Sequence, residues 1–112
     1  MRLRSDIWVS AFLRQGQSRG RFGAVIRKGS PEAGAVYVIV NHLDGTLHLF
    51  GPAPGSSIDA AGDRRWIEEL PFPADQPAVD RLLARRAAAD PDIWIVEIED
   101  RGGTAGLAAE AG

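Results

Sequence analysis

Two histidines, six residues apart, are the side chains of this sequence best suited to acid–base or metal chemistry. His42 and His48 flank Asp44-Gly45, a pair that favours a hairpin turn because glycine accepts a positive φ without strain. A two-residue turn puts His42 opposite Leu47 and the two imidazoles on opposite sheet faces, whereas a three-residue turn, Leu43-Asp44-Gly45, puts them on one face. Two ligands fall short of the three that a catalytic zinc usually takes. We therefore expect polar caps on strand ends, with no metal and no cofactor.

Acidic residues crowd the end of the last predicted strand, at Glu97, Glu99 and Asp100. Paired carboxylates can bind Mg²⁺ or act as acid and base, but no nucleophile or phosphate-binding loop accompanies them. We expect a charged rim that forms ion pairs with Arg64 and Arg65, or with the arginines near the N-terminus. These five residues are the predicted interaction surface.

No stretch of the sequence predicts catalytic residues. The segment Gly51–Ser57 combines glycines with hydroxyls, but it lacks the lysine and the following helix of a phosphate-binding loop. Its two serines, Ser56 and Ser57, have no identifiable His or Asp partner. The sequence therefore favours a protein that is not an enzyme.

The 112 residues fit one domain, and the 45% hydrophobic and 25% charged fractions are typical of globular proteins. The chain has no cysteine, which excludes disulfides and thiolate metal sites. Its net charge of −2 is unevenly spread: seven basic residues and one acid precede residue 29, and six acids and one base lie between Asp90 and Glu110. We favour ends that pack together over a basic binding face, and the near-neutral total argues against nucleic-acid binding.

The apolar periodicity predicts seven elements. Ser5-Asp6 can begin a helix that runs to about Gln17, with a strand over 7–13 as the alternative. The most regular helical pattern runs from Gln76 to Ala89. The predicted strands are Phe22–Arg27, Val36–Leu43, Thr46–Phe50, Arg64–Leu70 and Ile93–Ile98.

This order, α-β-β-β-β-α-β, predicts an α+β fold: a two-layer sandwich of two helices and a mostly antiparallel sheet of four to five strands. The last strand can lie parallel to the fourth, joined by a right-handed crossover through the second helix. We expect a single domain over residues 1–101 and a mobile Gly/Ala-rich tail over 102–112.

Four stretches resemble a family of small proteobacterial proteins catalogued as a domain of unknown function. They are RLRSDIWVSAFLR (2–14), GAVYVIVNHLDGTLHLFGPAP (34–54), Arg64-Arg65-Trp66 and DPDIWIVEIED (90–100). The resemblance covers the chain apart from the loop after Pro54 and the tail. It implies a cytoplasmic domain, and it supplies no activity, ligand or catalytic residue to transfer.

No apolar run approaches the ~20 residues of a membrane helix, and no signal peptide is visible. We expect a cytoplasmic protein that binds a protein partner through an exposed sheet edge or the acidic rim. The alternatives are a nucleic-acid-binding protein that uses the basic N-terminal third, and a small-molecule-binding protein or enzyme without a recognisable motif.

Overall fold

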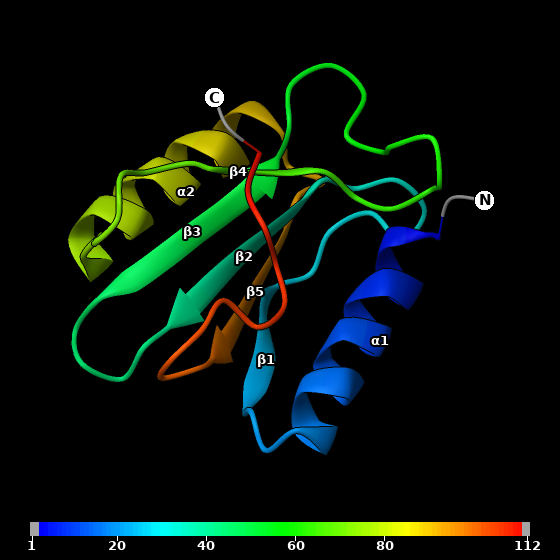
Figure 1. The fold of residues 1–112 in the computed structure, drawn as a ribbon. Coiled ribbons are helices and arrows are strands. Elements are labelled where there is room, and N and C mark those ends of the chain that lie inside the picture. Colours follow the sequence, from blue (N-terminus) through cyan, green and yellow to red (C-terminus); the bar gives the residue numbers. More distant parts are fainter. Residues whose placement is uncertain (1–2, 111–112) are drawn as a thin grey trace.

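The computed structural model describes residues 3–110. It contains two helices and five strands in the predicted order, which confirms the α+β class (Figure 1). The elements are α1 (Ser5–Ser18), β1 (Gly23–Arg27), β2 (Val36–Asn41), β3 (Leu47–Pro52), β4 (Trp66–Glu68), α2 (Gln76–Ala89) and β5 (Trp94–Glu99). None of the helices over these residues has the length and apolar character needed to span a membrane.

The five strands form one sheet in the order β1-β5-β2-β3-β4. β5 pairs parallel with β2 and antiparallel with β1, and the other two pairings are antiparallel. The sheet is therefore mostly antiparallel, as expected, but the predicted pairing of the last strand with the fourth is wrong. The three six-residue strands β5, β2 and β3 are mostly buried and occupy the interior of the sheet, while the three-residue β4 lies at an edge.

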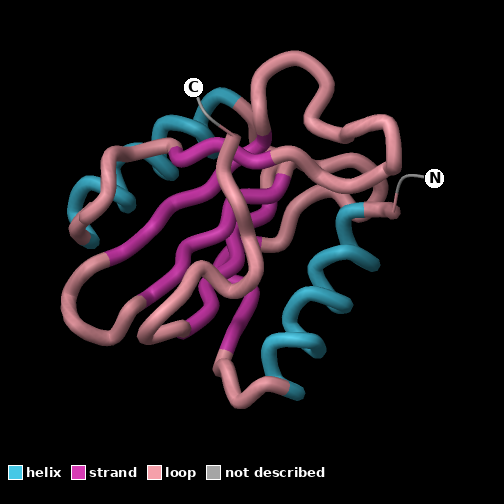
Figure 2. The backbone as a smooth tube through the Cα atoms, in the orientation of Figure 1, coloured by secondary structure: helices cyan, strands magenta, loops and turns pink. Residues whose placement is uncertain are grey.

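The two helices cover opposite faces of the sheet, so each face has its own core (Figures 1 and 2). On one face, Val9 and Phe12 of α1 pack against Val38 and Val96. On the other, the buried side of α2 packs against the alternate strand residues, which include Ile39 and Leu49. The sequence predicted two layers, whereas the structure has a helix–sheet–helix arrangement, because β2 has buried apolar residues at both parities.

Residues 5–18 are helical, so the alternative strand over 7–13 is wrong. Val9, Phe12 and Gly16 recur at helical spacing and form the buried side, while Ile7 points outward and is half exposed. A Cβ added at Gly16 would lie 2.5 Å from the Cδ1 atom of Ile98, so glycine permits the close approach of α1 to β5. Helix α1 ends before Gly20, which has a φ of 75°.

Of the two predicted alternatives for the hairpin between β2 and β3, the structure has the three-residue turn. Asn41 pairs with Leu47, and the His42 amide donates to the Thr46 carbonyl at 3.2 Å. Leu43 and Gly45 both have positive φ, 63° and 90°. The register therefore puts His42 and His48 on the same face of the sheet.

The C-terminal segment, expected to be mobile, lies against the sheet on the α1 face (Figure 1). Ala105 is buried, and Leu107 packs against the same core as Trp66. Ala109 forms a parallel bridge with Trp66, whose carbonyl accepts from the Glu110 amide at 2.8 Å. The segment therefore covers the outer edge of β4; residues 111–112 lie outside the described part of the chain.

Candidate functional site

The two histidines are directly hydrogen bonded. The Nε2 atom of His42 lies 2.7 Å from Nδ1 of His48, and the Nδ1 atom of His42 lies 2.8 Å from the carbonyl oxygen of Asp100. A carbonyl only accepts, so Nδ1 of His42 carries a proton. The pair links the turn after β2 to the residue after β5.

Two residues that the sequence analysis did not select complete this cluster. The Nε2 atom of His48 lies 3.1 Å from Oε1 of Glu68, and the ring of Phe72 stacks on that of His48 with centroids 3.9 Å apart. Glu68 comes from β4 and Phe72 from the loop that follows it. Their distance along the chain from the hairpin left no spacing signal that could have found them.

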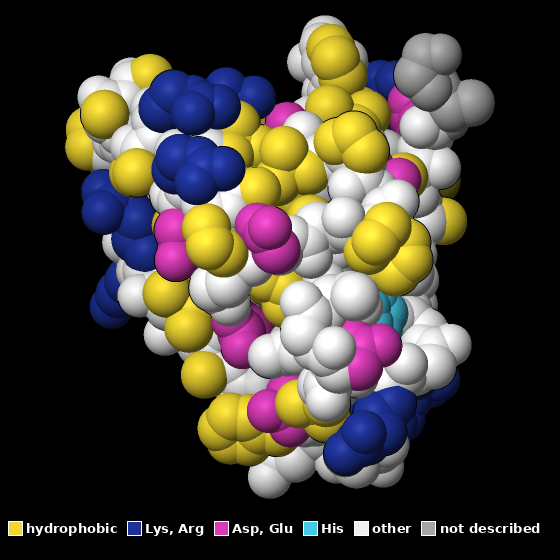
Figure 3. All heavy atoms as spheres, turned by 90° about the vertical axis from the view of Figure 1, so that its left-hand side faces the viewer, with side chains coloured by type: hydrophobic (Ala, Val, Ile, Leu, Met, Phe, Trp, Pro, Cys, Tyr) yellow, Lys and Arg dark blue, Asp and Glu magenta, His cyan; other side chains and the backbone are white. Residues whose placement is uncertain are grey.

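All four ring nitrogens of the pair therefore have polar neighbours, and only a small area of histidine reaches the surface seen in Figure 3. Burial lowers the pKa of His48 below its ordinary value, and the Glu68 carboxylate opposes this shift. Among residues 3–110, no group of three or more His, Asp or Glu residues is placed to hold a metal ion. The cluster joins the hairpin, β4 and the end of β5.

Two of the acidic residues at the end of β5, Glu97 and Asp100, contact different partners. Asp100 binds the Nε atom of Arg21 at 3.3 Å and also accepts from the Ala105 amide at 2.9 Å. Glu97 accepts from the Asn41 side chain at 3.4 Å, on the face covered by α2. An arginine near the N-terminus thus pairs with this end of β5.

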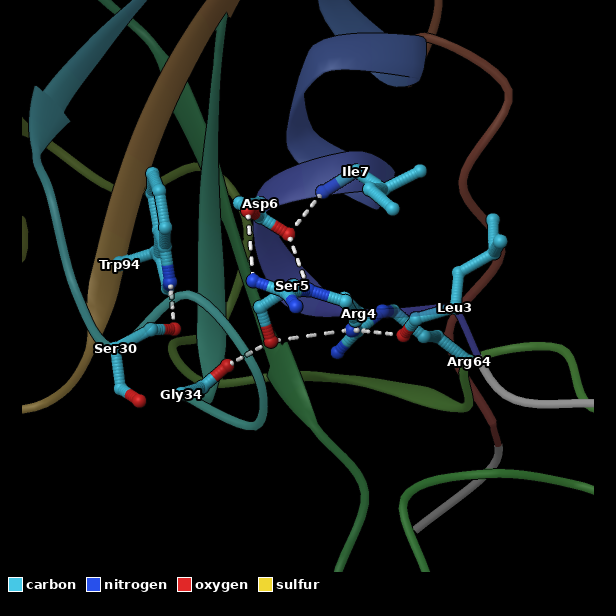
Figure 4. Close-up of polar contacts among 9 residues, drawn as sticks. All are labelled: Leu3, Arg4, Ser5, Asp6, Ile7, Ser30, Gly34, Arg64 and Trp94. Carbon is cyan, nitrogen blue, oxygen red and sulfur yellow. Dashed lines mark hydrogen bonds and ion pairs between the residues drawn. The ribbon is translucent and has the colours of Figure 1, made fainter.

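Arg64 and Arg65 lie at the other end of the sheet. Arg64 donates to the Ser5 hydroxyl at 3.3 Å (Figure 4). Its guanidinium also lies 5.5 Å from the ring centroid of Trp8. Arg65 forms a bidentate ion pair with Glu110 at 2.5 and 2.7 Å. Since they precede β4 where it pairs with the end of β3, both lie far from the hairpin end of the sheet.

The predicted interaction surface is therefore divided between two regions. Asp100 lies beside the hairpin end of β2, where its amide donates to the Asn41 carbonyl at 2.9 Å. Arg64 and Arg65 instead hold the N-terminal and C-terminal segments in place. The structure does not bring the two arginines together with the three acidic residues.

The outer edge of β1 is a further surface feature, and the sequence analysis did not single out its residues. β1 is an edge strand, and three large apolar side chains in it or directly before it are exposed: Phe22 (69%), Ile26 (59%) and Val25 (42%). The register with β5 shifts between Val25 and Arg27, so Ile26 is the extra residue of a β-bulge. The signal in the sequence is FGAVIR, a strand whose side chains are apolar at both parities.

A groove lies on each side of this edge, one at the Gly23 end of β1 and the other at the Ile26–Arg27 end. One has a volume of about 400 Å³ and lies against α1, with Leu13, Arg14, Arg21 and Phe22 in its lining. The other has a volume of about 310 Å³ and lies against α2. Its lining includes Ile26, Leu83, Ala84, Ile95, Asp80 and Glu97.

The two edges of the sheet thus differ. The C-terminal segment bridges to Trp66 on β4, whereas within residues 3–110 no strand pairs with the outer side of β1. Exposed apolar edge strands pair readily with other chains. This edge is the feature of the described structure best suited to recognition.

Comparison with known proteins places the whole fold in a family. No curated protein matches the chain. The chain is 41% identical to a DUF1491 family protein from Caulobacter crescentus with a known crystal structure. The match covers 96% of each chain, with a TM-score of 0.78. It is 38% identical to a protein from A. tumefaciens with a known solution structure. That match covers 99% of this chain and 98% of the other, with a TM-score of 0.82. The family model described as a protein of unknown function (DUF1491) matches residues 3–108, and the chain belongs to this family.

Proposed function

We propose that this protein is a cytoplasmic interaction module that binds an extended segment of another protein along the outer edge of β1. The observation that carries the proposal is the contrast between the two sheet edges. The β4 edge is bridged by the chain's own C-terminal segment, while β1 presents Phe22, Val25 and Ile26 to solvent. A cysteine-free chain needs no oxidising compartment.

An extended segment suits this edge for two reasons. A strand added to an open edge gains main-chain hydrogen bonds, and its alternate side chains enter grooves on the two faces of the sheet. The bulge at Ile26 confines regular pairing to the part of β1 before it and moves that side chain out of register. The exposed apolar side chains then supply contacts beyond the short ladder.

A second copy of this chain suits the edge less well. Antiparallel pairing of two β1 strands about a two-fold axis brings Arg21 of one copy close to Arg27 and Lys28 of the other. Like charges opposed across strands are destabilising. The charge of the strand therefore favours a different protein as the occupant.

The test uses lysine substitutions, since lysine is a residue that natural edge strands use against pairing. The double variant V25K/I26K adds two charges to the edge, and Leu43→Lys adds one at the hairpin turn, where Leu43 has the same exposure as Val25 (41% and 42%). Partners captured from the native extract by the wild-type protein are identified by mass spectrometry, purified and titrated against all three forms.

We expect one partner to lose at least about tenfold in affinity for V25K/I26K and to keep its affinity for L43K. Circular dichroism melts of all three forms check that the fold is retained. A purified partner that binds V25K/I26K as tightly as the wild type would contradict the proposal, as would a wild-type protein that retains no partner at all.

A further inference from the structure

The two grooves beside β1 carry opposite charge. On the α1 side, Arg14 is exposed and Arg21 also lines the groove, where its guanidinium is shared with Asp100 at 3.3 Å. The charged side chains in this lining are both basic. An acidic side chain that enters this groove gains the attraction of Arg14.

On the α2 side, two carboxylates lie over an apolar floor. Asp80 accepts from the side-chain amide of Gln76 at 2.8 Å, and Glu97 accepts from the side-chain amide of Asn41 at 3.4 Å. Both donors are neutral, so neither carboxylate is neutralised by these bonds. Arg27 also lines this groove, and its Nη2 atom donates to the Pro91 carbonyl at 3.0 Å, which leaves two acidic groups against one basic group.

The floor of the α2-side groove consists of aliphatic side chains, among them Ile39, Leu83 and Ile95. A lysine or arginine can lay its methylene stem on such a floor and still reach carboxylates at the rim. This groove therefore fits a long basic side chain better than a short polar one.

A strand on the β1 edge places successive side chains on opposite faces of the sheet. Residues of the bound segment at an odd separation thus point to the two different grooves, which lie at opposite ends of β1. We infer that the partner segment carries an acidic residue directed to Arg14 and a basic residue directed to Asp80 and Glu97, at an odd separation along the chain. This inference rests on the proposed function and specifies the partner at the same edge.

The experiment is a selection of random twelve-residue peptides displayed on phage, with the wild-type protein as bait and V25K/I26K as the counter-selecting form. We expect the enriched peptides to carry Asp or Glu and Lys or Arg one or three positions apart. A synthetic peptide of the enriched type should bind R14E about tenfold more weakly than the wild type. Replacing its acidic residue by lysine should restore that affinity.

The matched control is Arg85→Glu, a charge reversal at an exposed position of α2 outside the groove lining, which should leave the affinity unchanged. Enriched peptides that need the β1 edge but show no charge alternation would overturn this inference and leave the proposed function standing. Peptides that bind V25K/I26K as well as the wild type, or a selection without enrichment, would overturn both.

Discussion

The Nε2 atom of His42 lies 2.7 Å from the Nδ1 atom of His48, across the end of the β2–β3 hairpin. The bond exists because Leu43 and Gly45 take positive φ and form a three-residue turn that puts both rings on one face. Through Glu68 and the carbonyl of Asp100, the pair connects the β2–β3 hairpin to β4 and to the end of β5. A local choice of turn thus determines a contact between distant parts of the chain.

Protein stability should fall as the pH is lowered below neutrality, in part because of His48. Burial depresses its folded-state pKa below the ordinary value of 6.5, so its contribution is present above pH 6.5 and is lost as the pH falls through the folded value. Urea unfolding of the wild type and His48→Gln at pH 7.5 and 5.5 measures this. The variant should be less stable at pH 7.5 by about 1 kcal/mol and show a smaller loss on acidification. Equal losses in both proteins would contradict the assignment.

The contact between the C-terminal segment and β4 should weaken in acid. The Arg65 guanidinium holds the pKa of Glu110 below its ordinary value of 4.5, so the contribution of the pair is present above that pH and is lost as the pH falls through the lower, folded value. Hydrogen exchange of the Glu110 amide, which donates to Trp66, follows the contact. Glu110→Gln should lower the protection factor of this amide at pH 6 to that of the wild type in acid, and an unchanged protection factor would count against the ion pair.

Gly29→Ala should destabilise the fold by about 1–3 kcal/mol. A Cβ at Gly29 would lie 2.2 Å from the Asp92 carbonyl oxygen and 2.6 Å from the carbonyl carbon of Ile93, both backbone atoms. Gly102→Ala is the control, because a Cβ there meets nothing within 4 Å. Chemical denaturation of both variants measures the difference, and equal stabilities would show that the segment before β2 is less closely packed than described.

Ser5→Ala should cost about 1–3 kcal/mol of stability. The Ser5 side chain is fully buried, and its hydroxyl donates to the Gly34 carbonyl at 2.6 Å, joining the start of α1 to the segment before β2 (Figure 4). Removing the hydroxyl leaves that carbonyl with one bond fewer. The control is Ser18→Ala, at the exposed end of α1, which should change the denaturation midpoint little. If Ser18→Ala lowers the stability as much as Ser5→Ala does, the burial of the Ser5 hydroxyl is not the cause of the loss.

The sequence predicted elements more accurately than it predicted contacts. Gln76–Ala89 was obtained with its full bounds because its apolar residues recur at helical spacing and Pro77 fits its first turn; the structure adds Asp75 as the residue that caps it. The neighbours of β5 were not obtained, because the apolar pattern of a strand shows which of its residues are buried but not which strand lies beside it. The C-terminal segment looked unstructured because glycine and alanine carry no periodic signal, although Ala105 fills a place in the core.

The candidate site divides in the same way. The turn sequence allowed two registers for the hairpin, and only one of them puts the two histidines on the same face. Their partners Glu68 and Phe72 belong to other elements, so the residues around the hairpin could not predict them. The exposure of Phe22 and Ile26 depends on β1 being an edge strand, which only the order of the sheet determines. Edge position is a property of the assembled sheet and cannot be read from the strand itself.

The most direct measurement places a photo-crosslinking amino acid at Phe22 in one form of the protein and at Leu43 in another, both expressed in the native cell. The account predicts that the form labelled at position 22 crosslinks to one extended segment of another protein, identified by mass spectrometry, and that the form labelled at position 43 does not. Crosslinks from position 22 that reach only other copies of this chain, or a partner captured solely from position 43, would contradict it.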